Sequence, residues 1–373
     1  MRNIAICGGS LSSVFPHVAV LDQIEMEGVP VACGLVHTQD PVFDPAAPEN
    51  HDQVLVKIRA FSCNYRDKAL ILRMATRPDA PLSFYVVGSE FVGEVLAMGA
   101  GVTAFAPGDR VIGNGAWPGE HTSVRPGLPT NQGSKEIQAF HQAKLLAIPD
   151  AMPDEVAGGF PIGGQTSYSM VRKLNLAPGD AVLVTAARSN TSLFTIHALQ
   201  RYGAAVYATT TSDRNADALQ QMGLNALIRI DPHEDRLFAN GRFEAVMDET
   251  GGFDGVVDPF WDAHLDKVVD VMAYGGRYVT CGLQAQYHRL LNRDAAFTPA
   301  FGKIMGTVMT QGLQIIGNCI GSTEDLQNAL DDYAEGRLPV QIDSVFSGNA
   351  VGAFFDRTYN APDRFGKVVY RYD

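Results

Sequence analysis

The 373 residues suffice for two domains, and a hydrophobic share of 46% can fill the cores of both. A net charge of −12 argues against nucleic acid or an anionic membrane as the main partner, and no apolar run approaches the roughly 20 residues that span a bilayer. The five cysteines are scattered without paired spacing and no secretory pattern opens the chain, so we expect a cytoplasmic protein with reduced thiols.

The first third of the chain predicts a β-rich region. Residues 1–30 begin with a short apolar run that enters a glycine-rich turn, and we expect an edge strand and a loop there. Residues 31–50 contain three prolines and predict extended chain and turns. Val54 to Asn64 alternates apolar and polar residues, which indicates a half-buried strand. Tyr85 to Val111 adds strands separated by glycines, as in a small irregular barrel, and Arg125 to Ala139 predicts a long loop of the kind that forms lids or binding segments.

A strand–turn–helix–strand unit lies between Pro178 and Gly223. The run Ala181 to Ala187 is typical of a buried parallel strand, and the next segment places apolar residues on one helical face. Gly203 ends that helix, and Ala204 to Thr211 is a second strand. The right-handed crossover of such a unit places a ligand at the carboxyl ends of the strands, so we expect a dinucleotide site there.

The turn of this unit contains no glycine, although a dinucleotide fingerprint uses glycines to bring the backbone close to the pyrophosphate. The helix N-terminus still favours a phosphate through its N–H groups and dipole. The residues that could cap the helix or contact phosphate are Arg188, Ser189, Asn190, Thr191 and Ser192. Two interpretations stay open: these side chains replace the glycines in a working site, or nucleotide binding has decayed.

The remaining chain predicts further strands of the same sheet. They are the runs ALIRI, FDGVVD, GGRYVTCG and QGLQIIGNC. Thr323 to Gly336 predicts a capped amphipathic helix, and GKVVYRY near the end of the chain is a strand. A β-rich front and tail therefore flank a doubly wound middle.

This order of motifs resembles the medium-chain dehydrogenase/reductase superfamily. The motifs that carry the resemblance are VLVKIRA, GSEFVGEV, GDRVIG, PGDAVLVT, YGGRYVTCG and FGKVVYR, and it runs from Val54 to Tyr372. It implies an α/β fold with a GroES-like β-rich catalytic domain over residues 1–165 and 320–373. A Rossmann domain with a doubly wound parallel sheet would occupy residues 166–319, with the active site between the two. Such proteins are often homodimers that pair the edges of their Rossmann sheets.

Many members of this superfamily carry a catalytic zinc, and the resemblance assigns three ligand positions in this chain. These positions hold Asn64, Ser89 and Ile162. A zinc site needs thiolate, imidazole or carboxylate ligands, so we expect no metal. Cys63 is adjacent to the first position, and we interpret it as a small buried residue.

The segment CNYRD is similar to the zinc-free branch that includes quinone oxidoreductases and enoyl reductases. The resemblance implies hydride transfer from NADPH to the β-carbon of an activated C=C, followed by protonation of the enolate. It implies Asn64, Tyr65 and Thr166 as catalytic candidates, with Tyr168 a weaker one. Tyr65 is either a proton donor or an aromatic wall, and Asn64 and Thr166 fit contacts to the nicotinamide or its ribose better than chemistry.

The preference for NADPH rests on charge at the end of the second strand. NAD-specific sites place an acidic residue there to bind the ribose hydroxyls, whereas this chain has Thr210. Thr211, Ser212 and Arg214 follow, and hydroxyls with a cation accommodate a 2′-phosphate. A solvated charge at a helix start is the alternative interpretation of Arg214.

The leading hypothesis is a zinc-independent, NADPH-dependent reductase that acts on a small-molecule alkene or quinone. One alternative is a cofactor-free relative that binds a ligand without turnover, and another is a carbonyl or alcohol oxidoreductase of the same fold. Phe260 and Trp261 stand where relatives often have glycines, and they either narrow the substrate pocket or pack at a domain edge.

Overall fold

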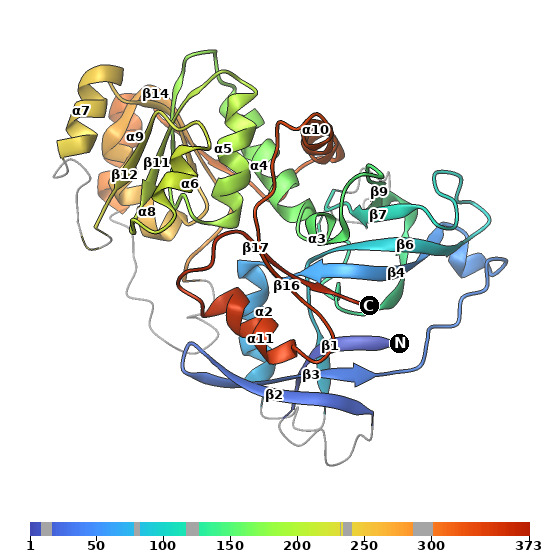
Figure 1. The fold of residues 1–373 in the computed structure, drawn as a ribbon. Helices are drawn as coiled ribbons and strands as arrows, with labels where there is room; N and C mark the ends of the chain where they lie inside the picture. The colour runs from blue at the N-terminus through green and yellow to red at the C-terminus, as the bar shows by residue number, and fades with distance from the viewer. Residues whose placement is uncertain (9–16, 78–82, 117–126, 232, 234–240, 286–300) are drawn as a thin grey trace. The chain divides into compact units, whose positions relative to one another are not determined.

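The computed structural model describes residues 1–8, 17–77, 83–116, 127–231, 233, 241–285 and 301–373 (Figure 1). They form two compact units. Unit 1 contains Met1–Ile162 and Ile342–Asp373, and unit 2 contains the described parts of Gly163–Gln286 and Asp294–Gln341. Among the described helices, none is both long and apolar enough to cross a bilayer.

The main sheet of unit 1 contains seven strands, which are β4 (Gln53–Ser62), β6 (Glu90–Met98), β7 (Arg110–Gly113), β8 (Ile137–His141), β9 (Leu145–Ala147), β16 (Ile342–Phe346) and β17 (Lys367–Arg371). Their order is β16-β17-β4-β6-β7-β9, and β8 pairs with β4. The alternating burial along β4 confirms the half-buried strand that the sequence predicts. Because β17 and β6 flank β4, segments from both ends of the chain meet on this strand.

A second sheet of unit 1 has the order β2-β3-β1-β5 and contains β1 (Arg2–Cys7), β2 (Val18–Met26), β3 (Val29–His37) and β5 (Phe84–Val86). The expectation of an edge strand in residues 1–30 is wrong for β1, because β3 and β5 pair with it on both sides. The edge strand is β2, whose alternating side chains are half exposed. β3 accounts for the extended chain expected at the start of residues 31–50, and Pro41, Pro45 and Pro48 follow this strand.

The predicted loop from Arg125 to Ala139 also contains regular structure. Its last residues belong to β8, which pairs along β4 from Lys57 to Gln53. The first two residues of this prediction lie outside the described residues.

Among the described residues of unit 1, the longer helices beside these strands are α2 (Tyr65–Ala75) and α11 (Val351–Tyr359). Helix α4 (Pro161–Leu174) begins at the end of unit 1 and belongs mostly to unit 2. A short helix, α3 (Asp154–Ala157), precedes α4. The core of unit 1 is rich in aromatic rings, with Phe61 in contact with Phe354 and Tyr370 at centroid distances of 5.5 and 5.6 Å. Helix α11 thereby packs its apolar face onto the strands that hold the site described below.

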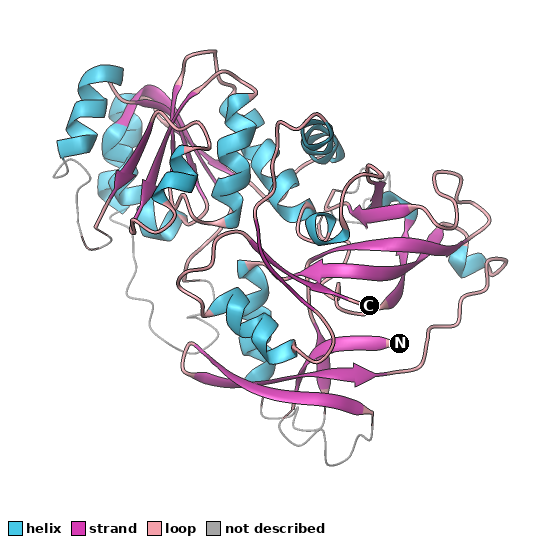
Figure 2. Cartoon of the chain, in the orientation of Figure 1, coloured by secondary structure: helices cyan, strands magenta, loops and turns pink. Residues whose placement is uncertain are grey.

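Unit 2 is a parallel sheet with the order β12-β11-β10-β13-β14-β15. Its strands are β10 (Ala181–Val184), β11 (Ala205–Thr210), β12 (Ala226–Arg229), β13 (Phe253–Asp258), β14 (Met272–Thr280) and β15 (Gln314–Gly317). The connecting helices are α5 (Asn190–Gln200), α6 (Ala216–Gln220), α7 (Gly241–Thr250), α8 (Trp261–Val268), α9 (Phe301–Gln311) and α10 (Thr323–Ala334). Helices lie on both sides of the sheet (Figure 2), which confirms the predicted doubly wound architecture. The strand order reverses between β10 and β13, and this is the point where such sheets bind ligands.

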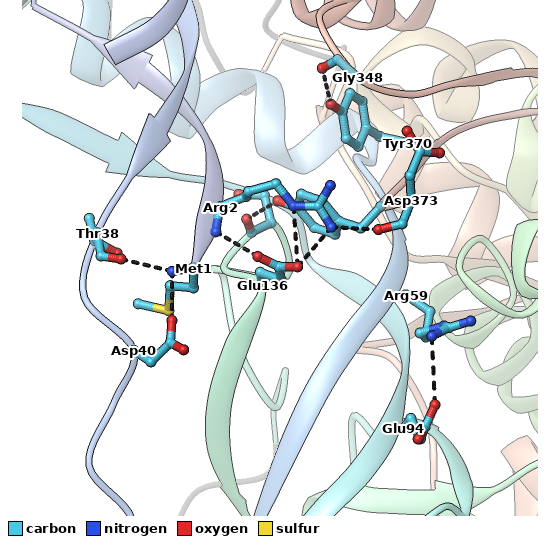
Figure 3. A network of polar contacts seen from close by, with 12 residues as sticks. Met1, Arg2, Thr38, Asp40, Arg59, Glu94, Glu136, Gly348, Tyr370 and Asp373 are labelled. Carbon is cyan, nitrogen blue, oxygen red and sulfur yellow. Dashed lines mark hydrogen bonds and ion pairs between the residues drawn. The ribbon is translucent and has the colours of Figure 1, made fainter. Parts of the chain in front are cut away.

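Charged contacts near the start of β1 join distant segments of unit 1 (Figure 3). The guanidinium of Arg2 donates to Glu136 Oε1 at 2.8 Å and to the carbonyl oxygen of Asp373 at 2.8 Å, and its backbone N–H donates to Glu136 Oε2 at 2.6 Å. Burial tends to raise the pKa of Glu136, but these bonds from Arg2 outweigh it and hold the pKa below its ordinary value. The carboxylate therefore contributes stability only while it is ionised.

We expect Glu136→Gln to lower the free energy of unfolding by about 2 kcal/mol at pH 7, because it removes the charge from the acceptor of the guanidinium and backbone bonds of Arg2. The pKa is lower in the folded state, so this contribution is present above the ordinary carboxyl pKa and is lost as pH falls through the folded value. Urea unfolding of both proteins at pH 7 and below pH 4.5 should show the difference shrinking. Glu94→Gln is the control: Glu94 is 39% exposed and lies 3.7 Å from Arg59, so its loss should cost under about 0.5 kcal/mol. An equal cost for both variants at pH 7 would contradict the prediction.

Candidate functional site

A buried polar cluster lies where three chain segments of unit 1 meet. We call it the Glu90 cluster, and it consists of the buried Ser62, Asp67, Ser89, Glu90 and Lys367 and the half-buried Asn64. Ser62 ends β4, Glu90 begins β6 and Lys367 begins β17, and these strands are neighbours in the sheet. Asn64 caps α2 and Asp67 lies in its first turn. The antiparallel register opposes Ser62 to Glu90, so the strand ends converge here.

Glu90 is fully buried, and both of its carboxylate oxygens accept hydrogen bonds. Oε1 accepts from Lys367 Nζ at 2.5 Å, from Asn64 Nδ2 at 2.9 Å and from the hydroxyl of Ser62. Oε2 accepts from the backbone N–H of Ile162 at 2.9 Å. A buried charge is tolerated only when it is paired and hydrogen bonded, and Glu90 meets both conditions.

Lys367 holds the side-chain amide of Asn64 in one orientation. Its ammonium donates to Asn64 Oδ1 at 2.7 Å, while Asn64 Nδ2 donates to Ser89 Oγ at 3.0 Å and to Glu90. Both amide hydrogens are thus engaged within the cluster, which favours a positioning role for Asn64. The lysine stem passes Gly159, where a Cβ atom would lie 3.1 Å from Lys367 Cβ and Cγ.

The structure brings together the three positions that the resemblance assigns to zinc ligands. Asn64 bonds Ser89, and the N–H of Ile162 bonds the carboxylate next to Ser89. Amide, hydroxyl and backbone groups are poor zinc ligands, and the ammonium of Lys367 contacts Asn64 and the neighbouring carboxylate of Glu90. Within the described residues, no three His, Cys, Asp or Glu side chains gather in a way that could hold a metal ion.

Sequence reasoning did not select Lys367 or Glu90. Both are charged residues at the start of apolar strands. A charged residue beside such a strand is a sign that it could be buried and paired, and both residues are buried here. Cys63 is buried as expected, and this burial raises the pKa of its thiol. Tyr65 is half-buried, and its ring lies 5.6 Å from the ammonium of Lys68, which pairs with Glu27.

In unit 2, side-chain hydrogen bonds hold the predicted glycine-free turn in one conformation. Ala186 has φ = +48°, a left-handed conformation that normally favours glycine. Ser189 caps α5 by accepting from the N–H of Ser192 at 3.1 Å. The Ser192 hydroxyl donates to the carbonyl of Thr185 at 2.8 Å and accepts from the Ser189 hydroxyl at 2.8 Å. Side-chain hydrogen bonds therefore maintain the turn that glycines allow in the usual fingerprint.

The other predicted residues of this turn lie at the start of α5. Arg188, Asn190 and Thr191 are half-buried, and the first N–H groups of the helix have no carbonyl partner within it. Thr166 is buried on α4 in the same unit. Its neighbour Ser167 donates to the carbonyl of Thr191 at 3.0 Å, so α4 packs against the beginning of α5.

The predicted 2′-phosphate segment follows β11 directly. Thr210 is the last residue of the strand and is buried, and its hydroxyl donates to the carbonyl of Ser212 at 2.9 Å. The Ser212 hydroxyl accepts from the N–H of Arg214 at 3.1 Å. Thr211 and Arg214 are exposed. The local hydrogen bonds thus use the hydroxyls of Thr210 and Ser212 to shape the turn.

A pocket of about 320 Å³ opens at the carboxyl ends of β10, β11 and β12. Thr185, Thr209, Thr211 and Ile230 line it on the strand side, and residues of α8 line it on the helix side. Thr209 Oγ1 is buried, and among the described residues it has no hydrogen-bond partner. A buried polar atom without a partner is costly, so this hydroxyl suits a ligand that fills the pocket.

Asp258, the last residue of β13, is a second buried carboxylate with several donors. Its oxygens accept from Thr185 Oγ1 and Tyr278 OH at 2.7 Å and from the N–H of Phe260 at 2.8 Å, and His264 Nδ1 lies 2.8 Å away. Burial tends to raise the pKa of Asp258, but the bonds from His264, Tyr278 and Thr185 hold it below the ordinary value. Neither Asp258 nor His264 is a site residue that sequence reasoning selected.

Phe260 and Trp261 begin the segment that joins β13 to β14. The N–H of Trp261 donates to the carbonyl of Gly282, and Asp262 accepts from the N–H groups of Gln284 and Ala285 at 2.6 and 2.8 Å. The chain after β13 is therefore tied to the chain after β14, while the 320 Å³ pocket lies between α8 and the ends of β10, β11 and β12.

Two family models match this chain. Residues 50–181 match the alcohol dehydrogenase GroES-like domain, and residues 191–335 match the zinc-binding dehydrogenase model. The chain is 28% identical over 318 residues to acryloyl-coenzyme A reductase of Metallosphaera sedula, covering 80% of this chain and 85% of that protein. It is 31% identical over 237 residues to the polyketide synthase GfsB of Streptomyces halstedii, but this match spans only 4% of that much longer protein.

Solved structures share the fold over the whole chain. An NAD-dependent alcohol dehydrogenase superposes with a TM-score of 0.75 at 24% identity, covering 100% of this chain and 99% of that one. The quinone oxidoreductase of Escherichia coli, complexed with NADPH, has a TM-score of 0.70 at 17% identity and covers all of both chains.

We expect Lys367→Met to lower the free energy of unfolding of unit 1 by about 3–5 kcal/mol, because Glu90 is left buried without its counter-charge. Adding Glu90→Gln to this variant should recover part of the loss, since the uncompensated charge is then gone. Denaturant unfolding of the two single variants and the double variant measures the coupling.

Lys303→Met is the matched control, because Lys303 pairs with Asp270 on the surface and is 43% exposed. It should cost under about 1 kcal/mol. Additive effects of Lys367→Met and Glu90→Gln would show that the two charges are not coupled.

Proposed function

Because the chain belongs to the medium-chain dehydrogenase/reductase superfamily, we propose that it is a zinc-independent reductase that transfers a hydride from NADPH to an activated C=C bond or a quinone. The pocket of unit 2 is the observation that carries this proposal. It lies at the carboxyl ends of a doubly wound parallel sheet. It contains the buried Thr209 hydroxyl, which has no hydrogen-bond partner among the described residues.

The residues of unit 2 fit a nicotinamide dinucleotide. The N-terminus of α5 suits the pyrophosphate, with Arg188, Asn190 and Thr191 around it. The mainly apolar pocket suits an adenine ring, and Thr210 stands where NAD-specific sites have an acid, with Thr211 to Arg214 beyond it. These features support NADPH over NADH and over a cofactor-free relative.

The Glu90 cluster supports a mechanism without zinc. In zinc-dependent enzymes the metal polarises the substrate oxygen, whereas here Asn64, at the first of the corresponding positions, accepts from the internal ammonium of Lys367. The cofactor supplies the hydride, and an enolate or hydroquinone oxygen then needs a hydrogen-bond donor and a proton. We assign the proton to Tyr65, the nicotinamide contact to Thr166 and the positioning of this segment to Asn64.

The choice of an activated alkene follows the curated relative. Acryloyl-coenzyme A is by its name the substrate of the Metallosphaera protein, and its C=C is conjugated to a thioester. The quinone oxidoreductase name of a structural neighbour supports the second acceptor class. The alcohol dehydrogenase name of another neighbour keeps a carbonyl substrate as the alternative.

Binding and isotope transfer together test this function. Isothermal titration should give an NADPH dissociation constant in a range of about 1 μM to 1 mM, with NADH weaker. Thr209→Val should weaken NADPH binding about fivefold, because it removes the pocket hydroxyl at constant volume. Thr195→Val is the control, since its hydroxyl bonds the carbonyl of Thr191 outside the pocket.

With 4-deuterated NADPH, an enone or an acryloyl thioester should carry deuterium on the β-carbon, and a proton from solvent on the α-carbon. Quinone reduction is followed by the loss of NADPH absorbance. No binding at millimolar NADPH and NADH would overturn the assignment. Deuterium on the carbonyl carbon of an aldehyde, with no alkene or quinone turnover, would replace it with the carbonyl alternative.

We also propose that two copies pair along β15, the edge strand of the described sheet in unit 2. Ile315 on this strand is 43% exposed, and Tyr274 and Met309 are 85% and 77% exposed. Tyr274 lies beside Gly312, just before β15, so these apolar residues are close to the edge. An unpaired apolar edge strand favours strand addition by a second copy.

Light scattering coupled to gel filtration should give the mass of a dimer for the native chain, and Ile315→Lys should shift it to a monomer of 40.2 kDa. Leu21→Lys is the matched control, because Leu21 is 37% exposed on β2, the edge strand of the second sheet in unit 1. A monomeric native chain would contradict the proposal.

A further inference from the structure

The hairpin that joins β2 to β3 turns at Glu27 and Gly28, between the paired residues Met26 and Val29. Its two turn residues have positive φ, +54° for Glu27 and +74° for Gly28, as a two-residue type I′ turn requires. Asparagine, aspartate or glycine normally occupies the first of these positions, because longer side chains disfavour the left-handed conformation. A glutamate there is strained, and this strain points to a use for its side chain. The family model that matches unit 1 begins at residue 50, so the hairpin lies outside it.

The glutamate of this turn pairs with a buried cation on α2. Glu27 Oε1 accepts from the ammonium of Lys68, whose side chain is 6% exposed. Helix α2 packs against β3, so the hairpin and the helix meet within unit 1 (Figure 1). A buried ammonium is costly without a counter-charge, and Glu27 supplies that charge.

Lys68 also contacts the ring of Tyr65 on the same helix. Its Nζ lies 5.6 Å from the ring centroid, which is within the range of a cation–π contact. Residues three apart share one face of a helix, so the backbone of α2 sets the register of this pair. A cation at this place stabilises the phenolate form of tyrosine relative to the neutral phenol, because opposite charges attract.

We propose that Lys68, anchored by Glu27, orients the ring of Tyr65 and stabilises the phenolate that remains when Tyr65 gives its proton to the reduced substrate. This inference rests on the proposed function, in which the proton comes from Tyr65. The O–H bond of Tyr65 breaks, the proton bonds to the α-carbon of the enolate or to the oxygen of the hydroquinone anion, and water later restores the hydroxyl. Lys68 and Glu27 are positioning residues, because they act through Tyr65.

The other titratable groups at the start of α2 add little charge near Tyr65. Arg66 and Asp67 follow it in sequence, and they pair with each other at 3.3 Å. Burial raises the pKa of the Cys63 thiol and of the Tyr359 phenol, so both groups are neutral at pH 7. The ion pair between the hairpin and the helix therefore dominates the electrostatics at the ring.

The ionisation of Tyr65 tests this contact without turnover. The ultraviolet absorbance of tyrosinate, compared between each protein and the same protein with Tyr65→Phe, isolates this phenol in a pH titration. Lys68→Met should raise its apparent pKa by about 0.5–1 pH unit, and Lys68→Arg should leave it near the native value because the charge is retained. Glu27→Gln should lower it, since the amide still accepts from the ammonium but no longer offsets its charge. A purely structural role would not give shifts of opposite sign.

Kinetics with NADPH and an acryloyl thioester test the role in the reaction. Lys68→Met should lower kcat about 5- to 20-fold at pH 7, change KM less than about threefold, and move the basic limb of the pH profile of kcat upward. Lys68→Arg should restore most of the rate. Glu25→Gln is the matched control, because Glu25 is exposed on the same hairpin, and its kcat should equal that of the native chain.

A double variant separates this role from stability. Lys68→Met combined with Glu27→Asn leaves neither member of the ion pair and gives the turn a residue that favours the left-handed conformation. It should melt at least as high as Lys68→Met alone. Its kcat should nevertheless stay as low as that of Lys68→Met.

If Lys68→Met leaves either the Tyr65 titration or kcat unchanged, the inference is overturned and the proposed function stands. Recovery of native kcat in the double variant would overturn it too, because the loss then reflects stability. Native kcat in Tyr65→Phe would remove Tyr65 as the proton donor and this inference with it, while NADPH binding and deuterium transfer would still support the reductase. If the native chain does not bind NADPH, the proposed function and this inference both fail.

Discussion

The ion pair between Lys367 and Glu90 is the interaction on which the candidate site of unit 1 depends. Removing two charges from water costs several kcal/mol per ion, and mutual attraction offsets this only with full hydrogen bonding. Glu90 has that bonding from three side chains and one backbone N–H, and Lys367 also bonds Asn64. The pair therefore requires the ends of β4, β6 and β17 to meet in a single arrangement, and this arrangement orients the start of α2.

A buried carboxylate that orients a neighbouring side chain also occurs in unit 2. Asp258 ends an apolar strand, is buried, accepts bonds from neighbouring segments and holds His264 beside a pocket. In each unit a buried carboxylate at a strand end fixes one adjacent side chain, which is Asn64 in unit 1 and His264 in unit 2. The low dielectric around such a carboxylate strengthens its hydrogen bonds, so the oriented side chain has little freedom.

Local patterns in the sequence predict much of this fold. The βαβ unit, the apolar face of α5 with Leu193 and Leu199, and the capping position of Ser189 all follow from spacing and residue type. Gly203 ends that helix with φ = +66°. The pair of Glu90 and Lys367 could not be predicted in this way, because 277 residues separate them and only the strand order brings them together. The expectation of an edge strand fails for β1 for a similar reason, because a strand's neighbours depend on long-range pairing.

The turn before α5, which side-chain hydrogen bonds hold in place, has a consequence for the proposed nucleotide binding by unit 2. Glycine turns adapt to a ligand because their backbone is soft, whereas here the hydroxyls of Ser189 and Ser192 and the left-handed Ala186 define one shape in advance. Little conformational entropy remains to be lost on binding. A rigid turn cannot adjust to a phosphate group of a different size. Unit 2 should therefore discriminate strongly among nucleotide analogues that differ at the phosphates.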